Sequence, residues 1–66
     1  MKLTINGQTK NISNAATVAD LAAQFCPNRK SIIAEINGAI VPCGQWDKTI
    51  LKEGDAVELV AFVGGG

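Results

Sequence analysis

Three consecutive glycines, Gly64, Gly65 and Gly66, close the sequence and carry its most specific chemistry. Glycine has no Cβ, so such a segment is a thin peptide that can enter a narrow channel. A terminal carboxyl has an unperturbed pKa of about 3.3–3.7, so the Gly66 carboxyl is ionised at neutral pH. A carboxylate can attack the α-phosphate of ATP and form an acyl-adenylate, which a sulfur or amine nucleophile then opens. The residues therefore predict a carboxyl carrier in which Gly66 is activated while Gly64 and Gly65 enter a partner's active site. The alternative is a flexible chain end.

The other reactive side chains form no catalytic or metal-binding set. The sequence has no histidine, which removes the commonest general base and the commonest metal ligand. The thiols of Cys26 and Cys43 alone make a poor zinc site. Neither has an evident cationic neighbour that would activate it, so we interpret both as structural rather than as parts of a sulfur relay. We expect no metal, no bound cofactor and no catalytic residue, so a partner enzyme must supply catalysis.

Composition narrows the classes of partner and compartment. Six Lys plus Arg balance six Asp plus Glu, and the sequence pI is about 6.1, which argues against nucleic acid binding. No apolar run approaches the roughly 20 residues that span a bilayer, and the start of the chain lacks a secretory signal pattern. With only two cysteines, we expect a cytoplasmic protein with reduced thiols.

The elements that must hold the glycine tail in place are short strands and a helix. Asn6-Gly7 and Asn37-Gly38 each predict a two-residue hairpin turn, because both residues tolerate positive φ. Thr17 is a good N-cap with Asp20 three residues later, which predicts the start of a helix. In chain order we expect strands over 2–5 and 8–12, a helix from 18 that ends before Pro27, strands over 31–36 and 39–41, a polar connection over 43–48, and a last strand over 56–63.

The expected helix has one apolar face, which fits packing on one face of a sheet. That face consists of Val18, Leu21, Ala22 and Phe25, at helical spacing. The last strand can pair in parallel beside Leu3 and Ile5 through a crossover connection. This order favours the α+β class and the β-grasp (ubiquitin-like) fold, a mixed sheet of four to five strands with one main helix on one face. We assign residues 1–63 to the β-grasp domain and residues 64–66 to a flexible C-terminal glycine tail.

Alternation along the last strand predicts a docking surface next to the tail. If Val57 and Leu59 face the core, Val60 and Phe62 lie on the opposite face. Exposed large apolar side chains often mark contacts. We therefore expect the following residues to bind a partner: Glu58, Val60, Phe62 and Val63. The alternative places Phe62 in a small cluster with Trp46 or the first strand.

Two other features have an ordinary interpretation that we favour. Glu53, Asp55 and Glu58 can complement a basic partner surface, but charges of this kind more often belong to a solvated turn. Trp46 can anchor an interface, but a lone tryptophan in a small domain more often closes the edge of the core, with its N–H bonded outward.

A longer pattern unites several of these residues. It consists of the segment from Asn37 to Pro42, Trp46, Gly54-Asp55, and the ending from Phe62 to Gly66. Together with length and strand order, it resembles the ThiS family of sulfur carriers in thiamine thiazole synthesis. One position departs from the family, because Cys43 stands where members often carry a basic residue after the Val-Pro pair. We therefore expect a partner contact made by a basic residue at that position to be absent or replaced.

The resemblance implies a chemical role and a set of partners. A ThiF-like enzyme would use ATP to adenylate the Gly66 carboxyl, which would then become a thiocarboxylate. A sulfur donor such as a cysteine desulfurase would supply the sulfur, and a ThiG-like thiazole synthase would accept it. Nucleic acid and membranes are not expected partners.

Three alternatives share parts of the pattern. A MoaD-like carrier for molybdopterin synthesis would use the same terminal chemistry with another acceptor, but the short chain and the Val41-Pro42 pair with Trp46 favour the thiamine pathway. A ubiquitin-like modifier would be conjugated through Gly66 to lysines of other proteins. A plain binding module would keep its partner function after removal of Gly65 and Gly66.

Overall fold

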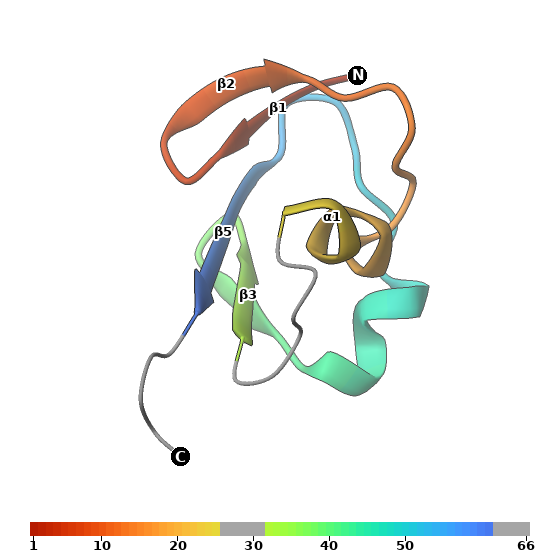
Figure 1. Ribbon diagram of the computed structural model, residues 1–66. Helices are drawn as coiled ribbons and strands as arrows, with labels where there is room; N and C mark the ends of the chain where they lie inside the picture. Colours follow the sequence, from red (N-terminus) through yellow and green to blue (C-terminus); the bar gives the residue numbers. More distant parts are fainter. Residues whose placement is uncertain (26–31, 62–66) are drawn as a thin grey trace.

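The computed structural model describes residues 1–25 and 32–61 (Figure 1). In chain order its elements are β1 (Lys2–Ile5), β2 (Gln8–Asn11), α1 (Val18–Phe25), β3 (Ile32–Ile36), β4 (Ala39–Val41), the 3₁₀ helix η1 (Cys43–Lys48) and β5 (Ala56–Ala61). No helix in these two ranges is long and apolar enough to cross a membrane. The predicted helix end at Pro27, and the predicted last-strand residues Phe62 and Val63, lie outside the described residues.

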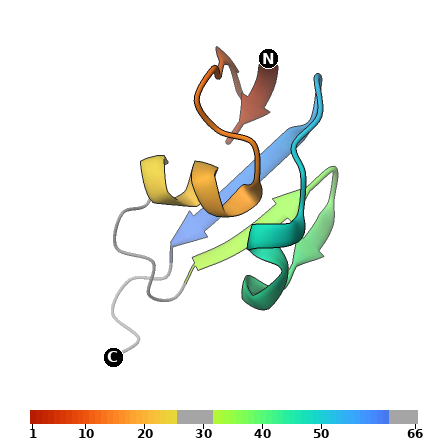
Figure 2. The same cartoon turned by 90° about the vertical axis from the view of Figure 1, so that its right-hand side faces the viewer.

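The strands form one five-stranded mixed sheet in the order β2-β1-β5-β3-β4. β1 and β5 run parallel, with Thr4 opposite Ala56 and Ile5 opposite Val57, whereas the other three pairings are antiparallel. Figure 2 shows α1, coloured orange to yellow, lying across one face of this sheet. The β-grasp prediction is confirmed, including the parallel pairing of the first and last strands.

Both Asn-Gly turns form as predicted. Asn6 and Gly7 have φ of 50° and 82°, and Asn37 and Gly38 have φ of 51° and 86°. Two central residues with positive φ define a type I′ turn, whose twist matches that of the strands it joins. Each turn therefore reverses the chain between neighbouring antiparallel strands, first β1 and β2, then β3 and β4.

The helix begins with the predicted reciprocal cap. The Asp20 N–H donates to Thr17 Oγ1 at 3.2 Å, and the Thr17 N–H donates to Asp20 Oδ2 at 3.1 Å. The Ala16 N–H donates to the same oxygen at 2.9 Å. These backbone donors, first that of Ala16 and then that of Thr17, lower the pKa of the Asp20 carboxyl from its ordinary value of 3.8. The cap satisfies the Asp20 N–H, which the first helical turn would otherwise leave unpaired, and the N–H groups of the two residues that precede the helix.

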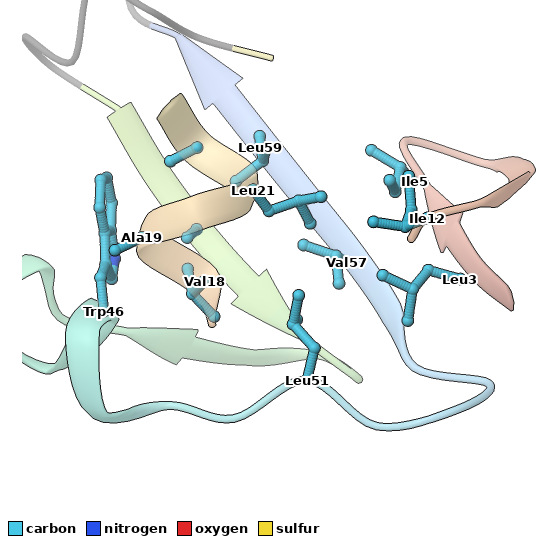
Figure 3. Close-up of a cluster of buried hydrophobic side chains, with 12 residues drawn as sticks. Leu3, Ile5, Ile12, Val18, Ala19, Leu21, Trp46, Leu51, Val57 and Leu59 are labelled. Carbon is cyan, nitrogen blue, oxygen red and sulfur yellow. The ribbon is translucent and has the colours of Figure 1, made fainter. Parts of the chain in front are cut away.

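The hydrophobic core fills the space between α1 and the covered face of the sheet (Figure 3). Trp46 of η1 closes one side of it and is only 1% exposed. Its ring Nε1–H donates to the Val41 carbonyl at 2.9 Å, so the interpretation of Trp46 as a core residue is confirmed. The buried hydrophobic residues are Leu3, Ile5, Ile12, Val18, Ala19, Leu21, Ala22, Ala34, Trp46, Leu51, Val57 and Leu59.

Two local expectations differ from the structure. Phe25, placed on the apolar helix face by its spacing, is 39% exposed, because it ends α1. The ammonium group of Lys10 lies 5.7 Å from the centre of its ring instead, a cation–π distance. The expected polar connection over 43–48 forms a 3₁₀ helix, η1. This compact turn places the Trp46 side chain in the core, where it is 1% exposed.

Candidate functional site

The strand β5 brings the chain to its glycine tail through the middle of the sheet. It lies between β1 and β3, and its pairing with β3 extends to Ala61, opposite Ile32. The predicted tail and docking residues Phe62, Val63, Gly64, Gly65 and Gly66 lie outside the described residues. The structure therefore shows the base of the candidate site, which is β5 and the surface around it.

Side chains along β5 alternate between the core and the open side of the sheet. Val57 and Leu59 are 1% and 6% exposed, whereas Val60 is 44% exposed and Glu58 is also exposed. In Figure 3, Val57 and Leu59 point from β5 toward α1. The predicted alternation is confirmed for these four residues.

Neighbouring strands extend the exposed side of β5 into a larger surface. Ile33 lies opposite Val60, Glu35 lies opposite Glu58, and Ile40 lies opposite Glu35 in the next strand. Ile40 is 65% exposed, and Ile33 is half-buried. We call this surface the open face; its members are Ile33, Glu35, Ile40, Glu58 and Val60.

Sequence reasoning found Glu58 and Val60 but missed Ile33, Glu35 and Ile40. Alternation within β4 was a usable signal for Ile40, because its neighbours Ala39 and Val41 point to the other face of the sheet. The same rule places Ile33 and Glu35 on the face of β3 that does not carry Ala34. What joined these side chains to Val60 was the pairing of three strands, which one-dimensional alternation does not contain.

Two carboxylates of like charge face each other across the open face. Glu35 and Glu58 are directly opposite in the β3–β5 pairing, an arrangement that destabilises a sheet. Within residues 1–25 and 32–61, neither carboxylate has an ion-pair partner. An acidic pair flanked by Ile40 and Val60 suits a partner surface that is both basic and apolar.

The other acidic residues near β5 have structural roles in the preceding turn. Glu53 Oε1 accepts from the Lys2 N–H at 3.0 Å. Asp55 Oδ2 accepts from the Lys52 N–H at 2.9 Å, and Asp55 Oδ1 accepts from Asn37 Nδ2 at 3.1 Å. Glu53 and Asp55 thus fit the turn interpretation, and of the three acidic residues only Glu58 belongs to the open face.

The described residues offer little chemistry of their own. Cys43 is an exposed free thiol at the first residue of η1, and Cys26 lies outside the described residues. In the described ranges, no three His, Cys, Asp or Glu side chains are grouped so that they could hold a metal ion. What the arrangement offers is a rigid base, a docking surface of mixed apolar and acidic character, and a strand that leads into the glycine tail.

Comparison with known proteins points in one direction. A model described as the ThiS family matches residues 3–66. The sulfur carrier protein ThiS of Bacillus subtilis (strain 168) is 34% identical over 65 residues, covering 97% of this chain and 98% of that protein. A crystal structure of the thiamine biosynthesis protein (ThiS) from Geobacter metallireducens superposes with a TM-score of 0.81 at 35% identity, covering 100% of both chains.

A longer relative contains a similar segment. The thiazole synthase of Paramagnetospirillum magneticum is 38% identical over 66 residues, which is the whole of this chain and 20% of that protein. The chain thus spans about a fifth of the length of this relative. A sequence of this kind therefore occurs both as a small separate protein and as part of a protein named for thiazole synthesis.

Proposed function

Since the chain belongs to the ThiS family of sulfur carriers, we propose that Gly66 carries sulfur as a terminal thiocarboxylate for thiamine thiazole synthesis. The match of the family model through residue 66 carries this proposal. It includes the glycine tail, where the sequence places the reactive carboxylate. The likeness to a ThiS crystal structure over the whole chain adds the fold that holds the tail.

The chemistry starts at the carboxylate of Gly66. One carboxylate oxygen attacks the α-phosphorus of ATP, pyrophosphate leaves, and an acyl-adenylate forms. A sulfide-level sulfur nucleophile then attacks the acyl carbon and AMP leaves, so sulfur replaces one oxygen of the original carboxylate. When the nucleophile is the persulfide of a sulfur donor, the product is an acyl disulfide, and two equivalents of a thiol reductant cleave its S–S bond to release the thiocarboxylate and the donor thiol. Glycine suits both steps because it is unhindered at Cα and has no stereocentre to lose on activation.

The proposed partners are those that membership of the ThiS family suggests. A ThiF-like adenylating enzyme would bind ATP and catalyse the activation, and a sulfur donor such as a cysteine desulfurase would supply the sulfur. A ThiG-like thiazole synthase would accept it, and this is supported by the thiazole synthase of P. magneticum, which contains a segment similar to the whole chain. These reactions need ATP, which suits a protein that works in the cytoplasm.

The open face would orient the tail toward the activating enzyme. It lies on β3, β4 and β5. Because β3 and β5 are paired as far as Ala61, docking there fixes the point from which residues 62–66 follow. Ile40 and Val60 would supply apolar contacts, and Glu35 and Glu58 would select a basic partner surface. Exposed apolar side chains surrounded by charge are the usual composition of such a surface.

ATP–pyrophosphate exchange with the adenylating enzyme of the host tests the activation step. We expect exchange that depends on the intact chain and that disappears when Gly65 and Gly66 are deleted. As a matched control, Gly44→Ala changes a glycine at which an added Cβ meets no atom within 4 Å, and it should leave exchange unchanged. Exchange that survives the deletion would contradict the proposal.

The acceptor is identified by a second reaction. Thiocarboxylate protein supplied to a thiazole synthase should yield thiazole, whereas a molybdopterin-type carrier would serve a molybdopterin synthase instead. Stable attachment of Gly66 to lysines of other host proteins would indicate a modifier. Either of the last two results would overturn the assignment to thiamine synthesis.

A further inference from the structure

Both Asn-Gly turns hold β5 through their asparagine side chains, in addition to reversing the chain. The Leu59 N–H donates to Asn6 Oδ1 at 2.9 Å, and Asn6 Nδ2 donates to the Leu59 carbonyl at 3.3 Å. The Ala56 N–H donates to Asn37 Oδ1 at 3.0 Å. Asn37 therefore holds the beginning of β5, and Asn6 holds the half of β5 that leads to the tail.

The side chain of Asn6 acts where the β1–β5 pairing has already ended. The paired positions are Thr4–Ala56 and Ile5–Val57, and the chain then turns away toward β2. In Figure 1 the hairpin of β1 and β2 lies beside the first part of β5, and β5 continues beyond it. On the other edge, pairing with β3 continues to Ile32–Ala61. One edge of β5 is thus held by a strand for longer than the other.

The amide of Asn6 takes the place of the next strand residue. The Asn6 backbone N–H donates to the Val57 carbonyl at 2.9 Å, and two residues further along β5 the polar groups on this edge are those of Leu59. A side-chain amide has the same donor and acceptor groups as a peptide unit. The Asn6 amide bonds both groups of Leu59, as a continued β1 would.

Leu59 lies in the half of β5 that leads to the glycine tail, and it is held there by its backbone and by its side chain. Its side chain is 6% exposed and belongs to the buried core, and its backbone lies two residues before Ala61. Asn6, the side-chain packing of Leu59 and the pairing with β3 together fix this end of the strand on three sides. Residues 62–66 follow directly from it.

We propose that Asn6 is a positioning residue for the chemistry of the terminal carboxylate, because its amide fixes the tail-proximal end of β5. This consequence rests on the proposed function, since it assumes that the Gly66 carboxyl reacts. The carboxylate must align with the α-phosphorus of ATP, and misplacing a reacting group by about 1 Å can cost on the order of 100-fold in rate. Asn6 itself touches no reacting atom.

A matched pair of variants separates positioning from general stability. Asn6→Gly and Asn37→Gly both keep the turn, because glycine accepts positive φ, and both raise the freedom of the unfolded chain equally. Each removes one amide that bonds β5. The two variants differ in which end of β5 is released.

Amide hydrogen exchange measures the effect on the strand without any partner. In Asn6→Gly we expect the protection of Leu59 and Val60 to fall by at least about tenfold, because both hydrogen bonds between the Asn6 amide and Leu59 are lost. In Asn37→Gly the protection of the Leu59 and Val60 amides should fall only as much as the free energy of unfolding of the whole protein falls. If Val60 keeps its wild-type protection in Asn6→Gly, Asn6 caps one amide without fixing the strand end, and the inference is overturned.

Activation kinetics test the consequence for the tail. At a temperature where both variants are folded, the carrier's kcat/KM in ATP–pyrophosphate exchange should fall by about 10-fold to 100-fold for Asn6→Gly. Asn37→Gly should stay within about twofold of wild type. Equal losses in the two variants would overturn the inference. No exchange by the wild-type chain would refute the proposed function, while hydrogen exchange would still decide whether Asn6 fixes the strand.

A conservative variant covers the case in which Asn6→Gly does not fold. Asn6→Asp keeps the size of the side chain and an acceptor for the Leu59 N–H, but it places an oxygen against the Leu59 carbonyl. We expect faster exchange at Val60 than in the wild type. Unchanged exchange at Val60 in this variant also overturns the inference.

Discussion

Adjacent residues on β5 should have opposite roles, which two alanine variants can separate. Leu59 is 6% exposed and Val60 is 44% exposed, so truncating Leu59 opens a cavity in the core whereas truncating Val60 removes part of the open face. Leu59→Ala should cost about 3 kcal/mol in free energy of unfolding, within the usual range for a buried leucine. Val60→Ala should cost about 1 kcal/mol, since its side chain is only partly buried.

These costs are large against the stability of so small a protein. At about 0.05–0.15 kcal/mol per residue, the 66 residues would provide roughly 3–10 kcal/mol. One kcal/mol shifts the Tm of such a domain by about 4–8 °C. The Leu59→Ala variant should therefore melt about 12–24 °C lower than the wild type, and Val60→Ala only about 4–8 °C lower.

The assay is thermal unfolding by circular dichroism, paired with the carrier's KM in ATP–pyrophosphate exchange. In exchange run where both variants are folded, Val60→Ala should raise the KM by about fivefold, because it weakens docking by about 1 kcal/mol. Leu59→Ala should leave the KM of its folded fraction nearly unchanged, and any loss should fall on kcat, because the packing of Leu59 helps to fix the tail-proximal end of β5. If Val60→Ala lowered Tm more than Leu59→Ala, or if only Leu59→Ala raised the KM, the division of β5 into a core side and a docking side would be refuted.

Three further variants test separate contacts. Glu58→Gln should raise Tm slightly, because it removes like-charge repulsion with Glu35 worth about 0.2–1 kcal/mol. The same variant should slow activation, because it removes a charge from the open face. The control Glu53→Gln weakens the hydrogen bond to the Lys2 N–H, so its Tm should fall. A lower Tm for Glu58→Gln would argue against the repulsion. Trp46→Phe removes the donor to the Val41 carbonyl and leaves a cavity, so denaturant unfolding should show a loss of about 2–3 kcal/mol, and a loss near zero would contradict its role in the core. The folded-state pKa of Asp20 is lowered, so the stabilisation from its cap is fully present above the unfolded pKa of 3.8 and is lost as pH falls through the folded pKa. The Tm gap between wild type and Asp20→Ala should therefore be constant from about pH 5 to 7, begin to narrow below about pH 4, and narrow further as pH falls. A gap that widens on acidification would refute the sign.

Features with short-range signals were predictable from the sequence. The two Asn-Gly turns and the Thr17–Asp20 cap each depend on residues at most three apart, and they formed as expected. The alternation of β5 was predictable for the same reason. The parallel pairing of β1 with β5 followed from the order of elements and the limited choice of ways to bury one apolar helix face.

Features that depend on packing between distant segments were not predictable. The 3₁₀ helix η1 forms around Trp46, whose burial depends on α1 and the sheet. The exposure of Phe25 depends on where the helix ends relative to the sheet. Asn6 lies 53 residues from Leu59 in the sequence. The local Asn-Gly pattern predicts the turn, but it does not show that the Asn6 side chain also forms hydrogen bonds with β5.

The open face shows the same limit at the candidate site. Glu58 and Val60 were found from β5 alone, but Ile33, Glu35 and Ile40 joined them only through the register of three strands. The tail residues were identified by their chemistry rather than by their packing. The candidate site is thus a combination of a terminal group visible in the sequence and a docking surface visible only in the fold.

The most direct test of the carrier role is intact-protein mass spectrometry of the chain purified gently from its native host, without added thiols. We predict a fraction heavier by the difference between one sulfur and one oxygen atom, with the change confined to the peptide that ends in Gly66. A chain that remains the free acid, even after incubation with ATP, host extract and a sulfur source, would contradict the account.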